Sequence, residues 1–160
     1  MEALFGEYKT LIIFLHVLSA VIWVGGMIAI RYAAHASFMQ IESPNRRLER
    51  ILHALKRLFI IVFPFVIILF VTAIIMIKGY ALSESPYSQY AHIKEGIWSV
   101  MAINLFVMIL RRNRAKRLLD MGDMMGAKFS LKLIGTFMVP VNIILGLIAI
   151  FLGTYLSTHI

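Results

Sequence analysis

Cysteine is absent from this chain of 160 residues. Its absence excludes disulfides, thiolate metal sites, iron–sulfur clusters and cysteine nucleophiles. Charge is also scarce: 15% of the residues are charged and 61% are hydrophobic, against about 25% and 45–50% in soluble domains. A soluble chain of this length has too little interior to bury so much apolar side chain. The composition therefore predicts an integral membrane protein.

Four apolar stretches follow one another along the chain, at roughly 10–34, 58–77, 92–110 and 131–156. Each approaches the ~20 residues that a helix needs to cross ~30 Å of hydrocarbon. The third is the weakest, because its uncharged, mostly apolar run, 97–110, holds only 14 residues. No stretch alternates as a membrane barrel strand would. We predict an all-α fold, a polytopic membrane protein in which residues 1–160 form a single four-transmembrane-helix bundle.

The basic residues are concentrated in the connections that follow the first and third stretches. Counted with Arg31 and Lys132 at the adjoining ends of the stretches, these connections hold 13 basic and 4 acidic residues, whereas the rest of the chain has a net charge of −1. By the positive-inside rule, both connections face the cytoplasm and both termini face the other side. In a bacterial inner (cytoplasmic) membrane, the N- and C-termini are then periplasmic. This topology accounts for the net charge of +8, so the expected partner is the lipid bilayer and not nucleic acid.

The first basic connection contains an amphipathic segment. Within residues 40–55, the side chains of Leu48, Ile51, Leu52 and Leu55 share one helical face. Such a pattern is typical of a helix that lies in the membrane interface. We therefore predict a short amphipathic cytoplasmic helix before the second span.

His16 is the most informative polar residue, because polar side chains inside hydrocarbon are costly and each suggests a functional site. It lies about two turns into the first stretch, and Trp23 follows two turns later on the same helical stripe. Gly25, Gly26 and the small residues at four-residue spacing after them predict a face for close packing. An imidazole beside such a face suits haem iron and its flat macrocycle. The alternative is a buried histidine hydrogen-bonded to another helix.

Other polar residues are candidates for the same site or for its surroundings. His92 enters the third stretch from the same side as His16, so the two are candidate metal ligands that face each other. Lys94 beside it is a candidate proton or substrate contact, or else its side chain snorkels to the interface. Arg31 and His35 close the first helix, and His35 lies about 28 Å along that helix from His16. They suit an acidic group such as a porphyrin propionate, and equally an ordinary interfacial anchor.

Three further patterns carry structural predictions. Asn104 and Asn142 lie deep in the third and fourth stretches, which predicts hydrogen bonds between these helices. Pro64 and Pro140 are predicted to kink their helices. Ten methionines would suit Cu(I), but they are scattered without a cluster on the outer side, so we predict that they mostly fill the core.

The order of these residues resembles two related groups of four-helix membrane proteins. His16 and Trp23, within a segment that ends Trp23-Val24-Gly25-Gly26, resemble the first helix of the HemJ family of haem-containing protoporphyrinogen oxidases and of the membrane domain of CopD-type copper proteins. The HemJ-like features are Arg31-Tyr32, His35, Arg47-Leu48-Glu49-Arg50, Pro64, His92-Ile93-Lys94 and Val139-Pro140. Kinship with HemJ implies that His16 is a haem ligand and that Arg31, His35 and Lys94 act in the active region.

The sequence therefore predicts a membrane protein with haem b as its cofactor, held by His16, with His92 as a second ligand and Trp23 against the ring. Its function would be electron transfer, or oxidation of a porphyrinogen or another hydrophobic donor of the quinone or porphyrin type. Two alternatives are a CopD-like copper-handling or transport protein, and a non-enzymatic accessory subunit. Either could assemble as a homo-oligomer or join a larger membrane complex.

Overall fold

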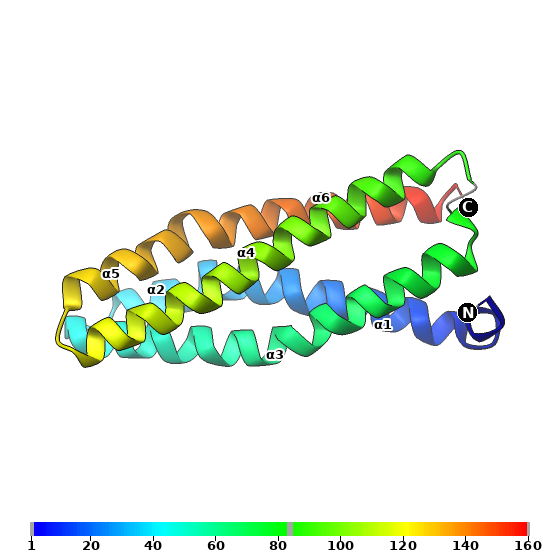
Figure 1. The fold of residues 1–160 in the computed structure, drawn as a ribbon. Coiled ribbons are helices and arrows are strands. Elements are labelled where there is room, and N and C mark those ends of the chain that lie inside the picture. Colours follow the sequence, from blue (N-terminus) through cyan, green and yellow to red (C-terminus); the bar gives the residue numbers. More distant parts are fainter. Residues whose placement is uncertain (1, 83–84, 160) are drawn as a thin grey trace.

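The computed structural model describes residues 2–82 and 85–159, which form a bundle of long helices (Figure 1). Four helical rods are long and apolar enough to cross a membrane: Phe5–Met39, Pro44–Gly79, Ser88–Asp120 and Met124–Ser157. No strand occurs in these two ranges. Each predicted span lies inside one of the four rods, and this confirms the all-α, four-helix membrane bundle.

The elements follow the chain in simple order. The first rod comprises α1 (Glu2–Ile28), a π-helical segment (Ala29–Ala34) and α2 (His35–Met39); the second is α3 (Pro44–Gly79) and the third is α4 (Ser88–Asp120). The fourth comprises α5 (Met124–Leu133), a second π-helical segment (Ile134–Met138) and α6 (Val139–Ser157). Helix α1 packs most extensively on α3, and α4 packs on α5 and α6, whereas α3 meets α4 more sparsely.

Both ends of the chain lie at one end of the bundle, and the two basic connections lie together at the opposite end (Figure 1). We call the latter the basic end. At 1.5 Å per residue the rods are about 50 Å long, well beyond the ~30 Å of a hydrocarbon core. The excess carries most of the arginines and lysines, as the charge pattern predicts for helices that extend out of the membrane.

The prediction of an amphipathic helix separate from the second span was wrong. Its residues are helical, but they belong to α3, which runs without interruption from Pro44 to Gly79. The reason is register: the buried positions of α3 recur at alternating four- and three-residue steps through both parts, at Leu48, Leu52, Leu55, Phe59, Val62 and Val66. The apolar face therefore stays on one side of one helix, and it packs in the core and not along the interface.

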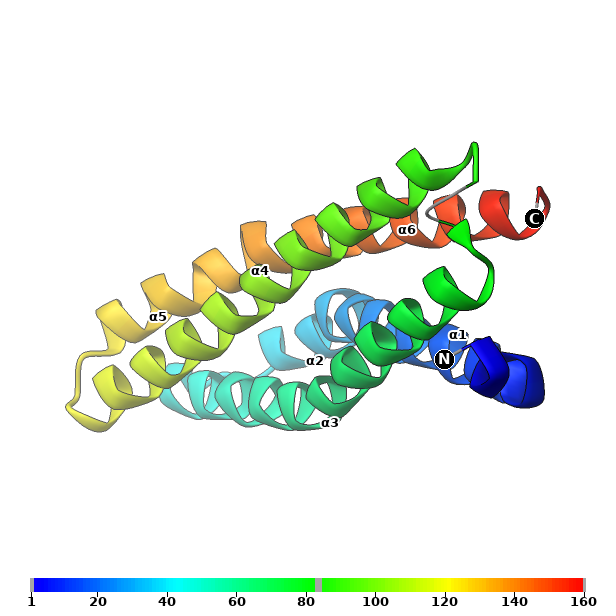
Figure 2. The same ribbon diagram turned by 45° about the vertical axis from the view of Figure 1, so that its right-hand side comes forward.

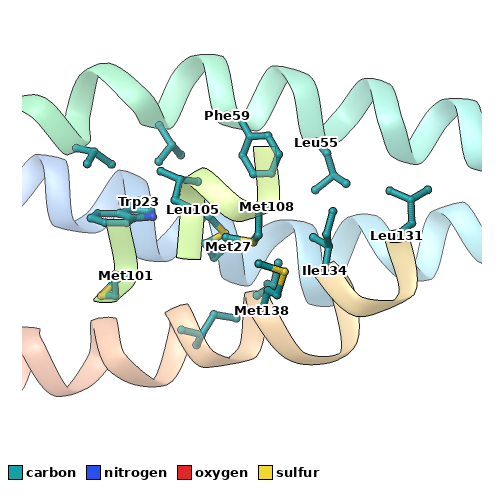
Figure 3. Packing of buried hydrophobic residues seen from close by; sticks show 14 of the residues in the cluster. Trp23, Met27, Leu55, Phe59, Met101, Leu105, Met108, Leu131, Ile134 and Met138 are labelled. Atoms are coloured by element: carbon teal, nitrogen blue, oxygen red, sulfur yellow. The ribbon is translucent and has the colours of Figure 1, made fainter. Parts of the chain in front are cut away.

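The centre of the bundle is filled mainly by buried apolar side chains. Figure 3 shows Trp23 and Met27 of α1 surrounded by apolar side chains from the other three rods. Four methionines are fully or almost fully buried here, namely Met27, Met101, Met108 and Met138. Their unbranched side chains fill gaps between the helices, which confirms a packing role for these methionines.

Asn104 and Asn142 join α4 to α6 inside this core, as predicted. Asn104 Nδ2 donates to Asn142 Oδ1 at 2.7 Å and to the Met138 carbonyl at 2.8 Å. Asn142, which is completely buried, donates from Nδ2 to the Met101 carbonyl at 3.4 Å. The two amides satisfy each other and nearby backbone, so they act in helix association.

The two prolines lie at different kinds of bend. Pro64 is inside α3, where it removes a backbone donor, and Figure 2 shows α3 changing direction along its length. Pro140 occupies the first turn of α6, directly after the π-helical segment Ile134–Met138. The wider turn precedes the proline ring, so the fourth rod remains continuous.

Gly146 lets α6 approach α1, and its replacement tests this contact. A β-carbon at Gly146 would collide with the Val24 side chain, whereas one at Gly25 would meet nothing within 4 Å. We expect Gly146→Ala to lower the free energy of unfolding by about 1–3 kcal/mol. Gly25→Ala, the matched control, should leave it unchanged or raise it by up to about 1 kcal/mol. Thermal unfolding in detergent measures both; equal effects would contradict the assigned helix contact.

Candidate functional site

His16 is held from α3 by a threonine. Its Nδ1 lies 2.9 Å from Thr72 Oγ1, and Thr72 is buried. The Thr72 hydroxyl is also 2.7 Å from the Ile68 carbonyl. A hydroxyl has one proton, and an approach this short between two oxygens requires that proton between them. Thr72 therefore donates to the backbone and accepts from His16.

This contact bears on the tautomer of His16. If Thr72 donates to the backbone, the proton of the neutral ring is on Nδ1. The Nε2 atom then carries the lone pair of the ring. A metal-binding histidine is commonly prepared in this way, with one ring nitrogen bonded to a neighbouring oxygen and the other free to coordinate.

Lys94 is a partly buried lysine on α4. A β-carbon built on Gly153 of α6 would be 3.0 Å from Lys94 Nζ, so the ammonium group lies over this glycine. The ion pairs within residues 2–82 and 85–159 are His92–Glu95 and Lys116–Asp120, and Lys94 belongs to neither. We call His16, Thr72, Lys94 and Gly153 the His16–Lys94 site.

The structure does not bring His92 to this site. His92 Nδ1 pairs with Glu95 Oε2 at 3.1 Å, and its side chain is 70% exposed. Two residues along a helix correspond to a rotation of about 200°, so His92 points outward when Lys94 points inward. The expectation that His16 and His92 face each other was therefore wrong. In the part of the chain that the structure describes, no three His, Asp or Glu side chains are grouped to hold a metal ion.

Arg31 and His35 lie far from the His16–Lys94 site. They are about 22 and 28 Å along the first rod from His16, toward the basic end. His35 is exposed. The Arg31 guanidinium lies over the Tyr32 ring at 5.8 Å, and its Nε atom is buried without a partner among the described residues.

Trp23 and the two glycines have different surroundings from those predicted. Trp23 is 1% exposed in the packed core, and its indole Nε1 has no acceptor in the described structure. Gly26 lets the Leu58 side chain of α3 pack closely against α1. A β-carbon at Gly26 would lie only 2.9 Å from Leu58 Cδ1. Gly25, Ala29 and Ala33 are exposed. Within residues 2–82 and 85–159, the face of Gly25, Ala29 and Ala33 therefore stays exposed, whereas Gly26 makes a close contact with α3.

An apolar groove runs between α3 and α4, next to the site. Its volume is about 250 Å³, and Phe63, Ile67 and Phe70 of α3 and Trp98, Ala102 and Phe106 of α4 contribute to its walls. Trp98 stacks on Phe70 with ring centroids 4.8 Å apart. Because Trp98 follows Lys94 by four residues, it lies one turn from the lysine on the same side of α4. Along α4, the groove therefore begins about one turn from Lys94.

Sequence reasoning identified His16 and Lys94 but missed Thr72 and Gly153. Thr72 is the single polar side chain between residues 58 and 77, a signal that could have drawn attention to it. Comparisons of the chain with family models, curated proteins and solved structures gave no match.

Proposed function

We propose that this protein binds haem b in the membrane through His16 and transfers electrons from a hydrophobic donor. The observation that supports the proposal is the 2.9 Å contact between His16 Nδ1 and Thr72 Oγ1, with Nε2 as the ring nitrogen that would bind the iron. The resemblance to HemJ and CopD-type proteins favours the same residue as a ligand. When bound, the haem supplies one-electron redox chemistry.

The residues present fit one axial ligand and one charged contact. His16 offers an imidazole whose orientation and protonation are fixed by Thr72. The Trp23 indole N–H is buried without an acceptor among the described residues, although buried donors are rarely left unpaired. His92 offers no second ligand from its outward position, so the proposal assigns His16 as the single protein ligand.

Lys94 would recognise acidic groups in this proposal. An ammonium partly removed from water attracts a carboxylate strongly, and Lys94 has no ion-pair partner among the described residues. A haem propionate or a carboxylate of a porphyrinogen donor meets this requirement. Arg31 and His35, near the opposite end of the membrane, are outside the reacting site in this proposal.

The groove between α3 and α4 would admit the donor from the bilayer. Its walls are apolar and aromatic, which suits a flat lipid-soluble molecule of the porphyrinogen or quinone type. We place the basic end in the cytoplasm of a bacterial inner membrane by the positive-inside rule. The termini and the His16–Lys94 site then lie toward the periplasmic side.

The test is the absorption spectrum of protein purified in detergent from haem-replete cells, oxidised and then reduced with dithionite. We expect sharp reduced bands of b-type haem at a ratio near one haem per chain. A colourless protein that retains copper would support the CopD-like alternative. A colourless, metal-free protein that co-purifies with a larger membrane complex would support the accessory subunit. Either colourless outcome would overturn the haem proposal.

A further inference from the structure

The basic end of α4 carries a groove that is far from the His16–Lys94 site. Its volume is about 650 Å³, and it is lined by apolar Val107 and Leu110 and by a group of basic side chains that includes Arg111, Arg114 and Arg117. All of these residues belong to α4.

The spacing of these residues places them on one helical face. Val107, Leu110, Arg114 and Arg117 follow one another at three- or four-residue steps, and Arg111 lies beside Leu110 on the same stripe. Along about 15 Å of helix, this stripe changes from apolar to cationic. We call Arg111, Arg114 and Arg117 the arginine stripe. The change occurs where α4 leaves the apolar span, at the level of lipid headgroups.

The arginine stripe has no acidic partner within residues 2–82 and 85–159, where the ion pairs are His92–Glu95 and Lys116–Asp120. Asp123 caps α5, where its Oδ1 accepts from the Gly126 amide at 2.8 Å. Arg112 differs from its neighbours: its Nε donates to the Leu52 carbonyl at 3.1 Å and ties α4 to α3. Three guanidinium groups on one face repel one another unless an anion lies between them.

We propose that the arginine stripe binds the phosphate of an anionic phospholipid, whose acyl chain lies along Val107 and Leu110. The positive-inside rule explains an excess of basic residues at this end, but not their alignment on one face that continues into an apolar surface. A soluble phosphate would use the cationic half of the groove alone. A phospholipid matches both halves, and basic pockets at this depth suit anionic headgroups.

The test measures binding of phosphatidylglycerol and phosphatidylcholine to the purified full chain by native mass spectrometry. The first variant is Arg111→Gln/Arg114→Gln/Arg117→Gln. The matched control is Arg46→Gln/Arg50→Gln/Arg57→Gln, which removes three exposed arginines of α3 at the same end. Both variants lose equal charge, so the difference between them isolates the groove from general surface attraction.

We expect wild type to prefer phosphatidylglycerol. The stripe variant should bind the first phosphatidylglycerol molecule roughly 100-fold more weakly than the control variant, given that three basic groups near the surface contribute about 1 kcal/mol each. The variant Arg111→Lys/Arg114→Lys/Arg117→Lys keeps the charge and the topology if the glutamine variant misfolds. This lysine variant should bind phosphatidylglycerol a few-fold more weakly than wild type, because lysine lacks the bidentate geometry of arginine. Equal binding by stripe and control variants would overturn the proposal, as would full displacement of the lipid by millimolar inorganic phosphate.

Discussion

Replacement of His16 by alanine should give a bundle that folds and inserts but is purified without haem. In the proposed site the His16 imidazole is the axial ligand, so its loss would remove the main attachment of the iron. We expect haem content to fall at least tenfold, measured from the reduced spectrum per chain. His92→Ala and His53→Ala are matched controls, because both side chains are exposed, and both variants should keep wild-type haem.

Two further measurements separate ligation from a structural effect. In His16→Gly, added imidazole should enter the vacated space and restore the haem spectrum, which a merely structural histidine would not permit. Thr72→Val should lower haem affinity about 10–100-fold, the usual cost of losing a group that orients a ligand. Thr72→Ser keeps the hydroxyl and should bind nearly as wild type. Equal haem content in His16→Ala and wild type would contradict the assignment.

The spans were predictable because each is encoded locally. Twenty apolar residues in a row favour a membrane helix wherever the rest of the chain lies, and basic connections favour one end of the bundle. Local composition did not predict whether residues 40–55 form a separate helix or part of the second span. Their apolar face shows its role only when the register from Leu48 to Val66 is followed through the junction, where no residue interrupts α3.

The site was predictable residue by residue but not as an arrangement. A histidine and a lysine inside apolar stretches attract attention on energetic grounds alone. Their pairing depends on helix rotation and on partners far away in sequence: Thr72 lies 56 positions from His16. The prediction for His92 failed for the same reason, because a two-residue offset from Lys94 turns the side chain to the other side of α4. The contact of Gly153 could not be predicted from the sequence. The absence of a side chain at Gly153 leaves space for the Lys94 ammonium group, which belongs to another helix.

Lys94→Met should make the protein more stable while it weakens recognition of acidic donors. Methionine keeps the length of the side chain but removes a charge that has no ion-pair partner in the described structure. A lysine at membrane depth costs about 2.5–3.5 kcal/mol at the centre of a helix. Since Lys94 lies near the start of α4, we expect the free energy of unfolding to rise by about 1–3 kcal/mol, measured by thermal or detergent-induced unfolding.

The same variant, Lys94→Met, should recognise acidic donors more weakly. Loss of a charge-assisted hydrogen bond to a carboxylate costs roughly 1.5–3 kcal/mol, so KM for a carboxylated porphyrinogen should rise about 10–100-fold, while KM for its methyl ester stays the same. Gly153→Ala puts a methyl group 3.0 Å from Nζ and should give a weaker form of the same defect by displacing the ammonium. If Lys94→Met lost stability, and if both donors were affected alike, the lysine would be a structural residue. Higher stability with selective loss of the acidic donor identifies a charge that is kept in the membrane for recognition and not for folding.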